Sequence, residues 1–404
     1  MNYLGIDISK KLYRCVILDN EGEALCKSFS IASSLDGFNS LIEKLEKLNL
    51  KPENLLTGLE ATGNFWENLY SFLTEKKFKV IVLNPYQTSK FRQVLMKKAK
   101  TDDIDAYVIA GLLRSNHYGS SFVPEQTVQD LRDIIKLRYE LMKDRKDYKR
   151  QVMSLLSLVF PEHTKTALKN PFTIASIKVL KKYPTAKHIA KTKVKHIERI
   201  VSKIQGHIFN IGAIDQLITT AKKSIYSGRS REARALKLTI LLEHIEKLNN
   251  SIELLDQEIS ETLNPKDDNN NFPGSNLLTI PGVGLKTVAA VISTVGTEGN
   301  AFSTATQYIG YIGFFPKIHQ SGDKTYENVI SKRGPRYIRW AHYMAAVASV
   351  MYNEEMRTLF HKKVSQGKSK KEALVYVAKK LAHMMLSMLK SGETYHRERV
   401  FVNC

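Results

Sequence analysis

Apolar and polar positions near the start of the chain follow two alternating patterns. Short apolar runs bounded by Asn, Asp or Gly predict strands, and apolar residues three and four apart predict helices. The predicted strands cover residues 3–8, 13–18, 24–31, 54–60 and 80–83, and the predicted helices cover 35–48, 66–75 and 102–113. The turn at residues 19–22 makes the first three strands an antiparallel meander. A meander followed by alternating helices and strands has the ribonuclease-H order, so we expect an α/β domain.

Two long helices are predicted in the middle of the chain, over residues 128–160, ending at Pro161, and over 231–263. The second has a seam of apolar residues that alternate steps of three and four over three heptads. The seam consists of Leu238, Leu241, Ile245, Leu248, Ile252, Leu255 and Ile259. This spacing predicts a coiled coil. Arg138 and Arg145 interrupt the comparable stripe of the first helix, so its coiled-coil signal is weaker.

The pattern divides the chain into three parts of mixed class, α/β followed by α. Residues 1–125 form the α/β domain, and residues 126–265 hold the long helices with a basic helical insert at about 161–230. Residues 266–404 begin with a polar linker and continue as a mostly helical region. The insert is rich in Lys and Arg between residues 181 and 203, which fits a solvated helix face and a nucleic-acid contact equally well.

Composition narrows the class of protein. With 404 residues, 43% hydrophobic and 25% charged, the chain is globular rather than disordered. Its 61 Lys and Arg against 40 Asp and Glu give a net charge of +21, which indicates a polyanionic partner such as nucleic acid. Residues 301–404 alone hold 17 Lys and Arg against seven Asp and Glu.

Three classes of protein are excluded by what the sequence lacks. No pair of its three cysteines has CxxC spacing, which excludes zinc ribbons and disulfide scaffolds and favours a reducing compartment. No stretch of about 18 apolar residues occurs, and the N-terminus has no secretory pattern. We therefore expect a cytoplasmic protein without membrane contact.

Four carboxylates occupy positions where they can converge. Asp7 ends the first strand in an apolar run, and Glu60 ends the fourth strand, its neighbour in the ribonuclease-H order. Asp102 and Asp105 are three apart on a helix, hence on one face. Four such carboxylates need cations, and Mg²⁺ or Mn²⁺ are the hard cations that oxygen ligands favour. Paired ions of this kind serve phosphodiester chemistry.

A glycine turn precedes a predicted helix in the C-terminal part. The turn Ile280–Gly284 resembles a helix-hairpin-helix, in which glycines such as Gly282 and Gly284 let backbone N–H groups approach a phosphate. A tight turn between core helices explains the same residues.

Two serines near a basic cluster are candidate nucleophiles. Ser321 precedes Gly322 in a predicted loop, and Ser331 is equally eligible on chemistry alone. No His-Asp triad is evident to activate either one. Phosphate-binding charge is supplied nearby by Lys332, Arg333, Arg336 and Arg339.

These motifs occur together in an order that resembles a known family. They are Gly5–Lys10, Glu60–Gly63, Asn84–Pro85, Lys100–Ala106, Pro281–Gly284, Ser321–Gly322 and Ile330–Gly334. The set resembles the DEDD-type insertion-sequence transposases, which include the Piv-type DNA invertases and recombinases described as bridge-RNA-guided. The resemblance covers about residues 1–160 and 230–360.

The resemblance implies a RuvC-like domain, a coiled coil for homo-oligomerisation as a dimer or tetramer, and a C-terminal transposase domain. It implies that Asp7, Glu60, Asp102 and Asp105 bind metal and that Ser321 is the nucleophile. Donor and target double-stranded DNA would be cut and rejoined in the nucleoid, guided by a structured non-coding RNA. The chain departs from compact members in its longer insert at 161–230 and its basic tail beyond residue 360.

Three other readings remain. A metal-dependent junction-resolving endonuclease would use water as the nucleophile and leave Ser321 structural. An actin-like ATP-binding protein would also open with a strand and an Asp, but no glycine-rich phosphate loop precedes Ile280. A non-catalytic nucleic-acid-binding protein would leave the four carboxylates without a role.

Overall fold

The computed structural model describes residues 1–61, 63, 65–95, 101–119, 122–263, 272–315, 320–321, 324–325, 330–332 and 334–399. The chain divides into two compact units, Met1–Pro124 and Glu125–Cys404.

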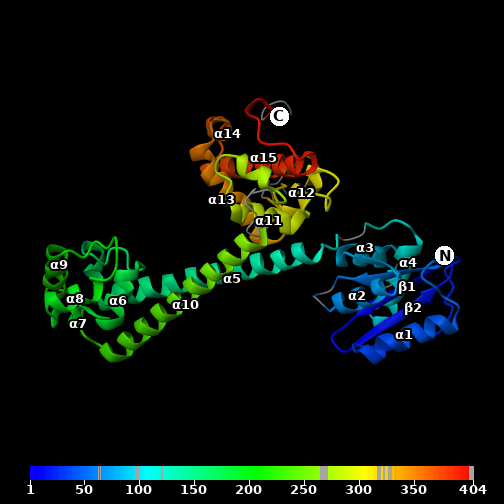
Figure 1. Ribbon diagram of the computed structural model, residues 1–404, viewed down its shortest axis with the longest axis horizontal. Helices are drawn as coiled ribbons and strands as arrows, with labels where there is room; N and C mark the ends of the chain where they lie inside the picture. Colours follow the sequence, from blue (N-terminus) through cyan, green and yellow to red (C-terminus); the bar gives the residue numbers. More distant parts are fainter. Residues whose placement is uncertain are drawn as a thin grey trace. The chain divides into compact units, whose positions relative to one another are not determined.

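The first unit is built around a five-stranded mixed sheet in the order β3-β2-β1-β4-β5. Strand β1 is antiparallel to β2 and parallel to β4, which confirms that the first and fourth strands are neighbours. The elements of this unit, most of them labelled in Figure 1, are β1 (Asn2–Ile8), β2 (Leu12–Leu18), β3 (Phe29–Ala32), α1 (Leu35–Lys47), β4 (Leu55–Glu60), α2 (Glu67–Glu75), β5 (Lys79–Leu83), α3 (Pro85–Val94) and α4 (Asp102–Arg114).

The two faces of this sheet carry different side chains because strand residues alternate. Leu4, Ile6 and Ile8 of β1 share a buried core with residues of α1 and α2 on one face. The opposite face, which includes Leu56 of β4, packs against α4.

Two elements differ from the sequence prediction. Strand β3 is four residues long rather than eight, because Ala24 forms only an isolated bridge to Leu18 and the chain bends before its pairing with β2 resumes at Phe29. Helix α3 was not predicted, because Asn84 and Pro85 were interpreted only as the end of β5. Asn84 instead caps α3 by accepting the Tyr86 N–H, and Pro85 occupies the first helical turn, where proline is favoured.

The second unit is helical. Its elements are α5 (Gln126–Val159), η1 (Pro161–Lys165), α6 (Ile174–Lys182), α7 (Ala186–Ala190), α8 (Val194–Val201), α9 (Ile211–Lys222), α10 (Arg231–Leu263), η2 (Ser275–Thr279), α11 (Leu285–Val295), α12 (Ala305–Ile312), the short strands β6 (Gln320–Ser321) and β7 (Lys324–Thr325), α13 (Arg336–Tyr352), α14 (Glu354–Ser365), α15 (Lys370–Ser391) and η3 (Arg397–Arg399).

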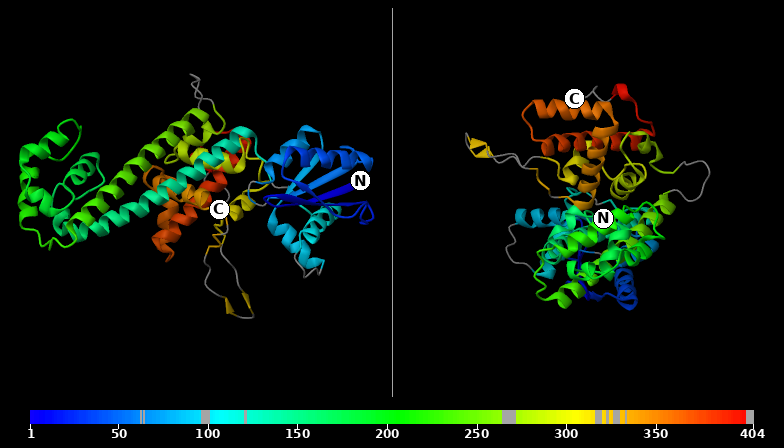
Figure 2. Two further views of the ribbon diagram at one scale, coloured as in Figure 1. Left: turned by 90° about the horizontal axis from the view of Figure 1, so that it is seen from below. Right: turned by 90° about the vertical axis from the view of Figure 1, so that its left-hand side faces the viewer.

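The long helices α5 and α10 lie side by side and antiparallel, as Figure 1 and the left view of Figure 2 show. Of the seam residues, Leu238, Leu241, Ile245, Ile252 and Ile259 are buried within the chain itself. The predicted bounds of α10 are confirmed at both ends.

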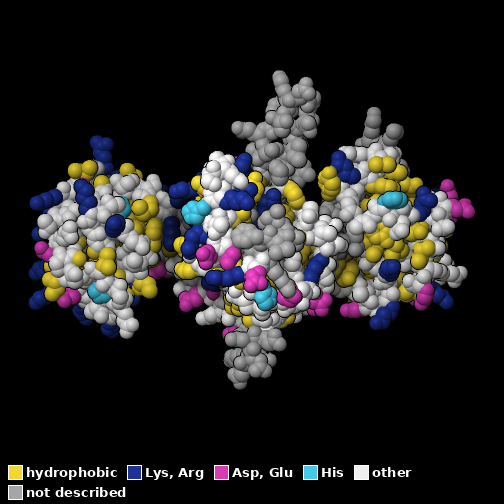
Figure 3. Space-filling view, turned by 90° about the horizontal axis from the view of Figure 1, so that it is seen from above, with side chains coloured by type: hydrophobic (Ala, Val, Ile, Leu, Met, Phe, Trp, Pro, Cys, Tyr) yellow, Lys and Arg dark blue, Asp and Glu magenta, His cyan; other side chains and the backbone are white. Residues whose placement is uncertain are grey.

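Two apolar cores use opposite ends of this helix pair. The core at one end joins Val152–Val159 of α5 and Leu238–Ile245 of α10 to the insert helices α6–α9. The face drawn in Figure 3 shows Lys and Arg side chains spread over that insert, with few carboxylates among them. The other core joins Val128–Ile135 and Ile259–Leu263 to the C-terminal helices α11–α15.

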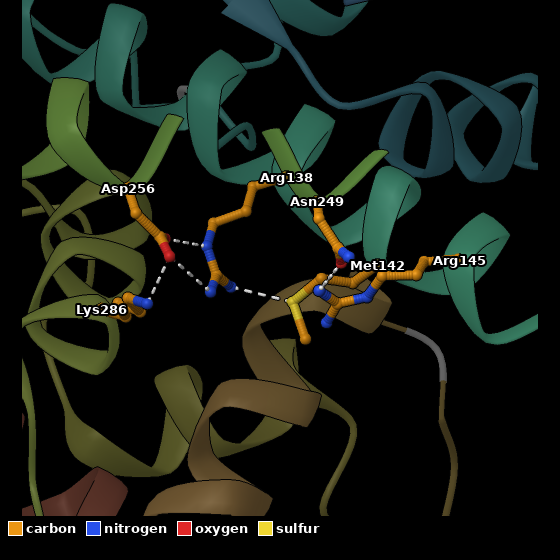
Figure 4. A network of polar contacts seen from close by, with 6 residues as sticks. All are labelled: Arg138, Met142, Arg145, Asn249, Asp256 and Lys286. Carbon is orange, nitrogen blue, oxygen red and sulfur yellow. Dashed lines mark hydrogen bonds and ion pairs between the residues drawn. The ribbon is translucent and has the colours of Figure 1, made fainter. Parts of the chain in front are cut away.

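Polar contacts also tie the helix pair together (Figure 4). The buried guanidinium of Arg138 on α5 forms an ion pair with Asp256 on α10, whose carboxylate also pairs with Lys286 on α11. Seven residues further along α5, Arg145 donates to the Asn249 side chain at 2.9 Å. No helix among the described residues is long and apolar enough to cross a membrane.

Candidate functional site

Asp7 and Glu60 lie next to each other in the sheet of the first unit. The parallel register of β1 and β4 pairs Gly5 with Gly58 and Ile6 with Leu59, so Asp7 and Glu60 are the next residues along the two strands. Both carboxylates are half-buried. Strand alternation places Asp7 on the face of Gly5 and Glu60 on the face of Gly58, which is the face covered by α4.

Helix α4 approaches this face closely because Gly5 and Gly58 have no side chains. A Cβ on Gly5 would lie 2.1 Å from the Ala106 carbonyl oxygen, and one on Gly58 would lie 2.8 Å from Leu113 Cδ1. Thr101 caps α4 by accepting the Ile104 N–H, so the helix starts with Asp102 and Asp105 in its first turn. These two carboxylates are thereby brought to the strand ends that carry Asp7 and Glu60.

The four carboxylates interact electrostatically. The pKa of Asp7 is raised to about 6, first by burial and then by the negative charges of Asp105, Glu60 and Asp102, in that order. The structure thus brings all four predicted residues into one electrostatic cluster. Asp105 is itself buried, whereas Asp102 is exposed.

Asp103, between them in sequence, takes no part in this cluster. Its carboxylate pairs with Arg14 on β2, and this hydrogen bond lowers the pKa of Asp103. The start of α4 thus holds three acidic residues with two roles. Asp102 and Asp105, the two that the sequence prediction selected, belong to the cluster, and Asp103 forms an ion pair.

Helix α3 adds two residues to the site that the sequence did not reveal. The Thr88 hydroxyl donates to Glu60 Oε2 at 2.7 Å, and the Arg92 guanidinium forms an ion pair with Asp105. The signal was present in the Asn84–Pro85 cap, since a helix starting there places Thr88 and Arg92 four residues apart on one face.

The donor chemistry of this cluster suits a hard divalent cation. Four carboxylates lie near the carboxyl ends of β1 and β4 and the start of α4, and a cation would relieve the repulsion that contributes to the raised pKa of Asp7. Within the described ranges, however, no three Asp, Glu, His or Cys side chains are already gathered closely enough to hold a metal ion.

Ser321 belongs to the second unit. It lies on β6, where its backbone pairs with Lys324 of β7. Gly322 and Arg333 lie outside the described residues. The alternative nucleophile Ser331 is half-buried, and its backbone N–H donates to the Phe315 carbonyl at 2.7 Å.

The predicted basic residues near Ser331 differ in their surroundings. Lys332 and Arg336 are exposed. Arg339 is half-buried and donates through Nη1 to the carbonyls of Ile312 and Gly334, at 2.9 and 3.1 Å. Arg339 thus also holds the chain that leads into α13.

The two glycines of the 280–284 turn also differ. Gly282 has φ +92°, and a Cβ there would lie 2.5 Å from the Ser349 backbone nitrogen, so the residue permits close packing on α13. Gly284 is exposed, precedes the first turn of α11 and has open space around it. The open surroundings of Gly284 suit a phosphate contact, and the close packing of Gly282 on α13 is also what a tight turn between core helices requires.

Comparison with known proteins links both regions to one class. A transposase model of the DEDD type from IS110 elements matches residues 4–161, and a model of the IS116/IS110/IS902 transposase family matches residues 274–361. The chain is 23% identical to the pilin gene-inverting protein of Moraxella lacunata over 98% of both chains. It is 24% identical to the uncharacterized 44.8 kDa protein of insertion element IS116 from Streptomyces clavuligerus, over 97% of this chain and 96% of that protein. The first model's match includes all four carboxylates, and the second includes Ser321.

Proposed function

Because the chain belongs to the IS116/IS110/IS902 family of transposases, we propose that it cuts and rejoins donor and target DNA with a metal-bound carboxylate tetrad and a serine nucleophile. The observation that carries this proposal is the electrostatic cluster around Asp7, in which burial and then three further carboxylates raise the pKa of Asp7 to about 6. A cluster of that kind is costly unless cations bind it.

The first unit is proposed to be RuvC-like. The sheet order β3-β2-β1-β4-β5 and the carboxylates at the ends of β1 and β4 support this assignment. Asp7, Glu60, Asp102 and Asp105 would hold Mg²⁺ or Mn²⁺, which would supply charge stabilisation at the scissile phosphate. Thr88 and Arg92 orient Glu60 and Asp105 by the contacts described above.

Ser321 is proposed as the nucleophile on the strength of the family resemblance. Attack by its hydroxyl on a DNA phosphate would form a serine ester and release a DNA hydroxyl. That ester conserves the phosphodiester energy, so the strand can be rejoined without a high-energy cofactor. The residues proposed to contact nucleic acid around it are Gly282, Gly284, Lys332, Arg333, Arg336 and Arg339.

The partners are proposed from charge and from the same resemblance. A net charge of +21 suits double-stranded DNA and a structured guide RNA, and affinity for both should fall steeply as salt rises. RNA should copurify with the protein at low salt, and RNase should stop recombination if the RNA is a guide. A homo-oligomer, a dimer or tetramer, is proposed from the resemblance alone, because the buried seam residues of α10 are already covered within the chain.

Metal dependence is tested by strand cleavage with Asp102→Asn and with Asp103→Asn as the matched control. Asp102→Asn should lower cleavage by roughly 100-fold or more, as loss of a group that stabilises transition-state charge does. Asp103→Asn changes the charge equally at the adjacent position and should retain cleavage, because its partner is Arg14. Full cleavage in excess EDTA contradicts the metal assignment.

The nucleophile is tested by trapping a reaction on labelled DNA and mapping the covalent adduct by mass spectrometry. An adduct at Ser321 that Ser321→Ala removes and Ser331→Ala retains supports the proposal. An adduct at Ser331 assigns the chemistry to that residue. Metal-dependent cleavage without any adduct indicates the junction-resolving endonuclease instead.

A further inference from the structure

A basic groove with aromatic walls runs between α5, α13 and α15 in the second unit. It has two adjoining parts of about 390 and 380 Å³, and Tyr139 and Trp340 line both of them. Volumes of this size accommodate small organic ligands. We call this surface the Trp340 groove. Most of the residues that line its two parts belong to α5, α13 and α15.

The lining of the Trp340 groove is strongly positive. Its cations are Lys143, Arg145, Lys146, Lys149, Arg336, Arg339 and Lys371. Among the described residues that line it there is no Asp or Glu. Burial and the neighbouring Arg145 lower the pKa of Lys149, and burial and Arg336 act to lower that of Arg339. Such crowded cations favour an anionic ligand.

Two arginines of α5 differ in the charge of their partners. Arg138 meets the carboxylate of Asp256, so its charge is neutralised within the helix pair. Arg145, seven residues later, meets the neutral amide of Asn249 at 2.9 Å (Figure 4). The charge of Arg145 therefore remains available to a ligand in the groove.

The aromatic side chains give the groove a second property. Tyr139 and Trp340 have ring centroids 6.0 Å apart and are tilted by 59°, and both rings are half-buried. Tyr343, also half-buried, lies in the same lining. Partly exposed rings flanked by cations are the arrangement on which unpaired bases stack while their phosphates meet Lys and Arg. A duplex offers no free base face to such rings.

We propose that the Trp340 groove binds an unpaired, single-stranded segment of nucleic acid, with a base against Trp340 and phosphates along Lys143, Lys146 and Arg336. This inference rests on the proposed function for the class of ligand, nucleic acid, and adds where and in which form it is held. RNA and DNA share the required chemistry.

The chain offers a direct reporter, because it contains only two tryptophans, Trp66 and Trp340. In full-length Trp66→Phe protein, Trp340 is the single source of tryptophan fluorescence. Titration in EDTA with a 12-nucleotide uridine RNA, the matching thymidine DNA and a 12-base-pair duplex separates the ligand forms. Single strands should quench this fluorescence at concentrations at which the duplex does not, and the better of the two strands identifies the source.

Affinity of a labelled single strand is then compared between variants. Trp340→Leu should weaken binding about 5- to 150-fold, and Trp340→Phe should restore most of it, since stacking contributes about 1–3 kcal/mol per base. Lys143→Gln with Lys146→Gln should weaken binding and reduce its salt dependence. Lys223→Gln with Lys247→Gln, which removes two exposed charges elsewhere, is the matched control.

Two results overturn the inference: unchanged Trp340 fluorescence at saturating single strand, and quenching by duplex at equal or lower concentration. If Trp340→Leu does not fold, the fluorescence titration and the lysine variants decide the question. The fluorescence titration does not depend on DNA cleavage. If the protein does not recombine DNA but single strands still quench Trp340, the proposed function is contradicted and the binding inference is not.

Discussion

Gly5 and Gly58 are direct partners across the parallel strands β1 and β4, and both abut α4. The two missing side chains let the helix lie against the sheet two residues before Asp7 and Glu60. A packing requirement thus fixes the depth at which Asp102 and Asp105 approach the strand ends.

Gly5→Ala should destabilise the first unit and impair the carboxylate cluster. Its Cβ would lie 2.1 Å from the Ala106 carbonyl oxygen, and overpacking of this kind costs about 1–3 kcal/mol. Thermal unfolding measures the loss. Gly111→Ala is the matched control on α4, because a Cβ there has only an ordinary 3.4 Å contact with Phe91. Equal melting temperatures for the two variants contradict the close-packing argument.

Asp7 should make stability fall as pH rises. Its pKa is about 6 when folded, above the ordinary value of 3.8, so ionisation is harder in the folded state. The contribution of Asp7 to stability is largest below pH 3.8 and is lost as the pH rises through 6. Asp7→Asn should therefore be more stable than the wild type at pH 7.5, by about 1–2 kcal/mol after allowance for partial exposure, and nearly equal at pH 4. Denaturant titrations at both pH values measure this difference.

The same carboxyl should make cation affinity depend on pH. A bound cation displaces the Asp7 proton, so the apparent affinity for Mn²⁺ should fall about tenfold for each pH unit below 6. Asp7→Asn should bind more weakly and lose this slope. Calorimetric titration with Mn²⁺ checks both, and an unchanged slope in the variant assigns the proton to another group.

Removing the carboxylate of Asp256 should destabilise the second unit more than removing Lys286. Asp256→Ala leaves the Arg138 guanidinium, 8% exposed as a residue, without its charge partner, at a cost of about 2–4 kcal/mol. Lys286 is half-exposed, so Lys286→Ala should cost less than about 1 kcal/mol. Chemical denaturation compares the two; similar losses show that Arg138 finds other partners.

Asn249→Asp should create a second ion pair on the pattern of Arg138 and Asp256. The new carboxylate would neutralise Arg145, which lines the Trp340 groove. We expect a stability gain of up to about 1 kcal/mol and a several-fold weaker single-strand affinity. Asn250→Asp adds the same charge at an exposed neighbouring position and should leave the affinity closer to wild type. Anisotropy titrations of a labelled strand compare them.

The sequence predicted the elements whose pattern is regular. The bounds of α10 and the adjacency of β1 and β4 followed from heptad spacing and from strand order. Helix α3 was missed because its cap, Asn84–Pro85, also fits a turn that ends a strand. Its apolar pattern is weak as well. Thr88 and Arg92 were missed with it.

The partner of the α10 seam could not be read from spacing alone. A heptad seam specifies that a helix packs against another, but not whether that helix belongs to the same chain. The structure buries Ile245 and Ile252 within the chain. Likewise, the sequence indicated that Gly282 lies in a turn, but only its distance to Ser349 shows the packing demand.

The antiparallel pairing of α5 and α10 makes the basic insert a replaceable part. The insert leaves α5 after Val159 and rejoins the pair at Arg231, and both points lie at the end of the pair that holds the insert core. Helices can be added or lost between them without changing the register of the pair or the C-terminal core. Chains of this architecture can therefore vary in length at this point while the rest of the unit stays the same.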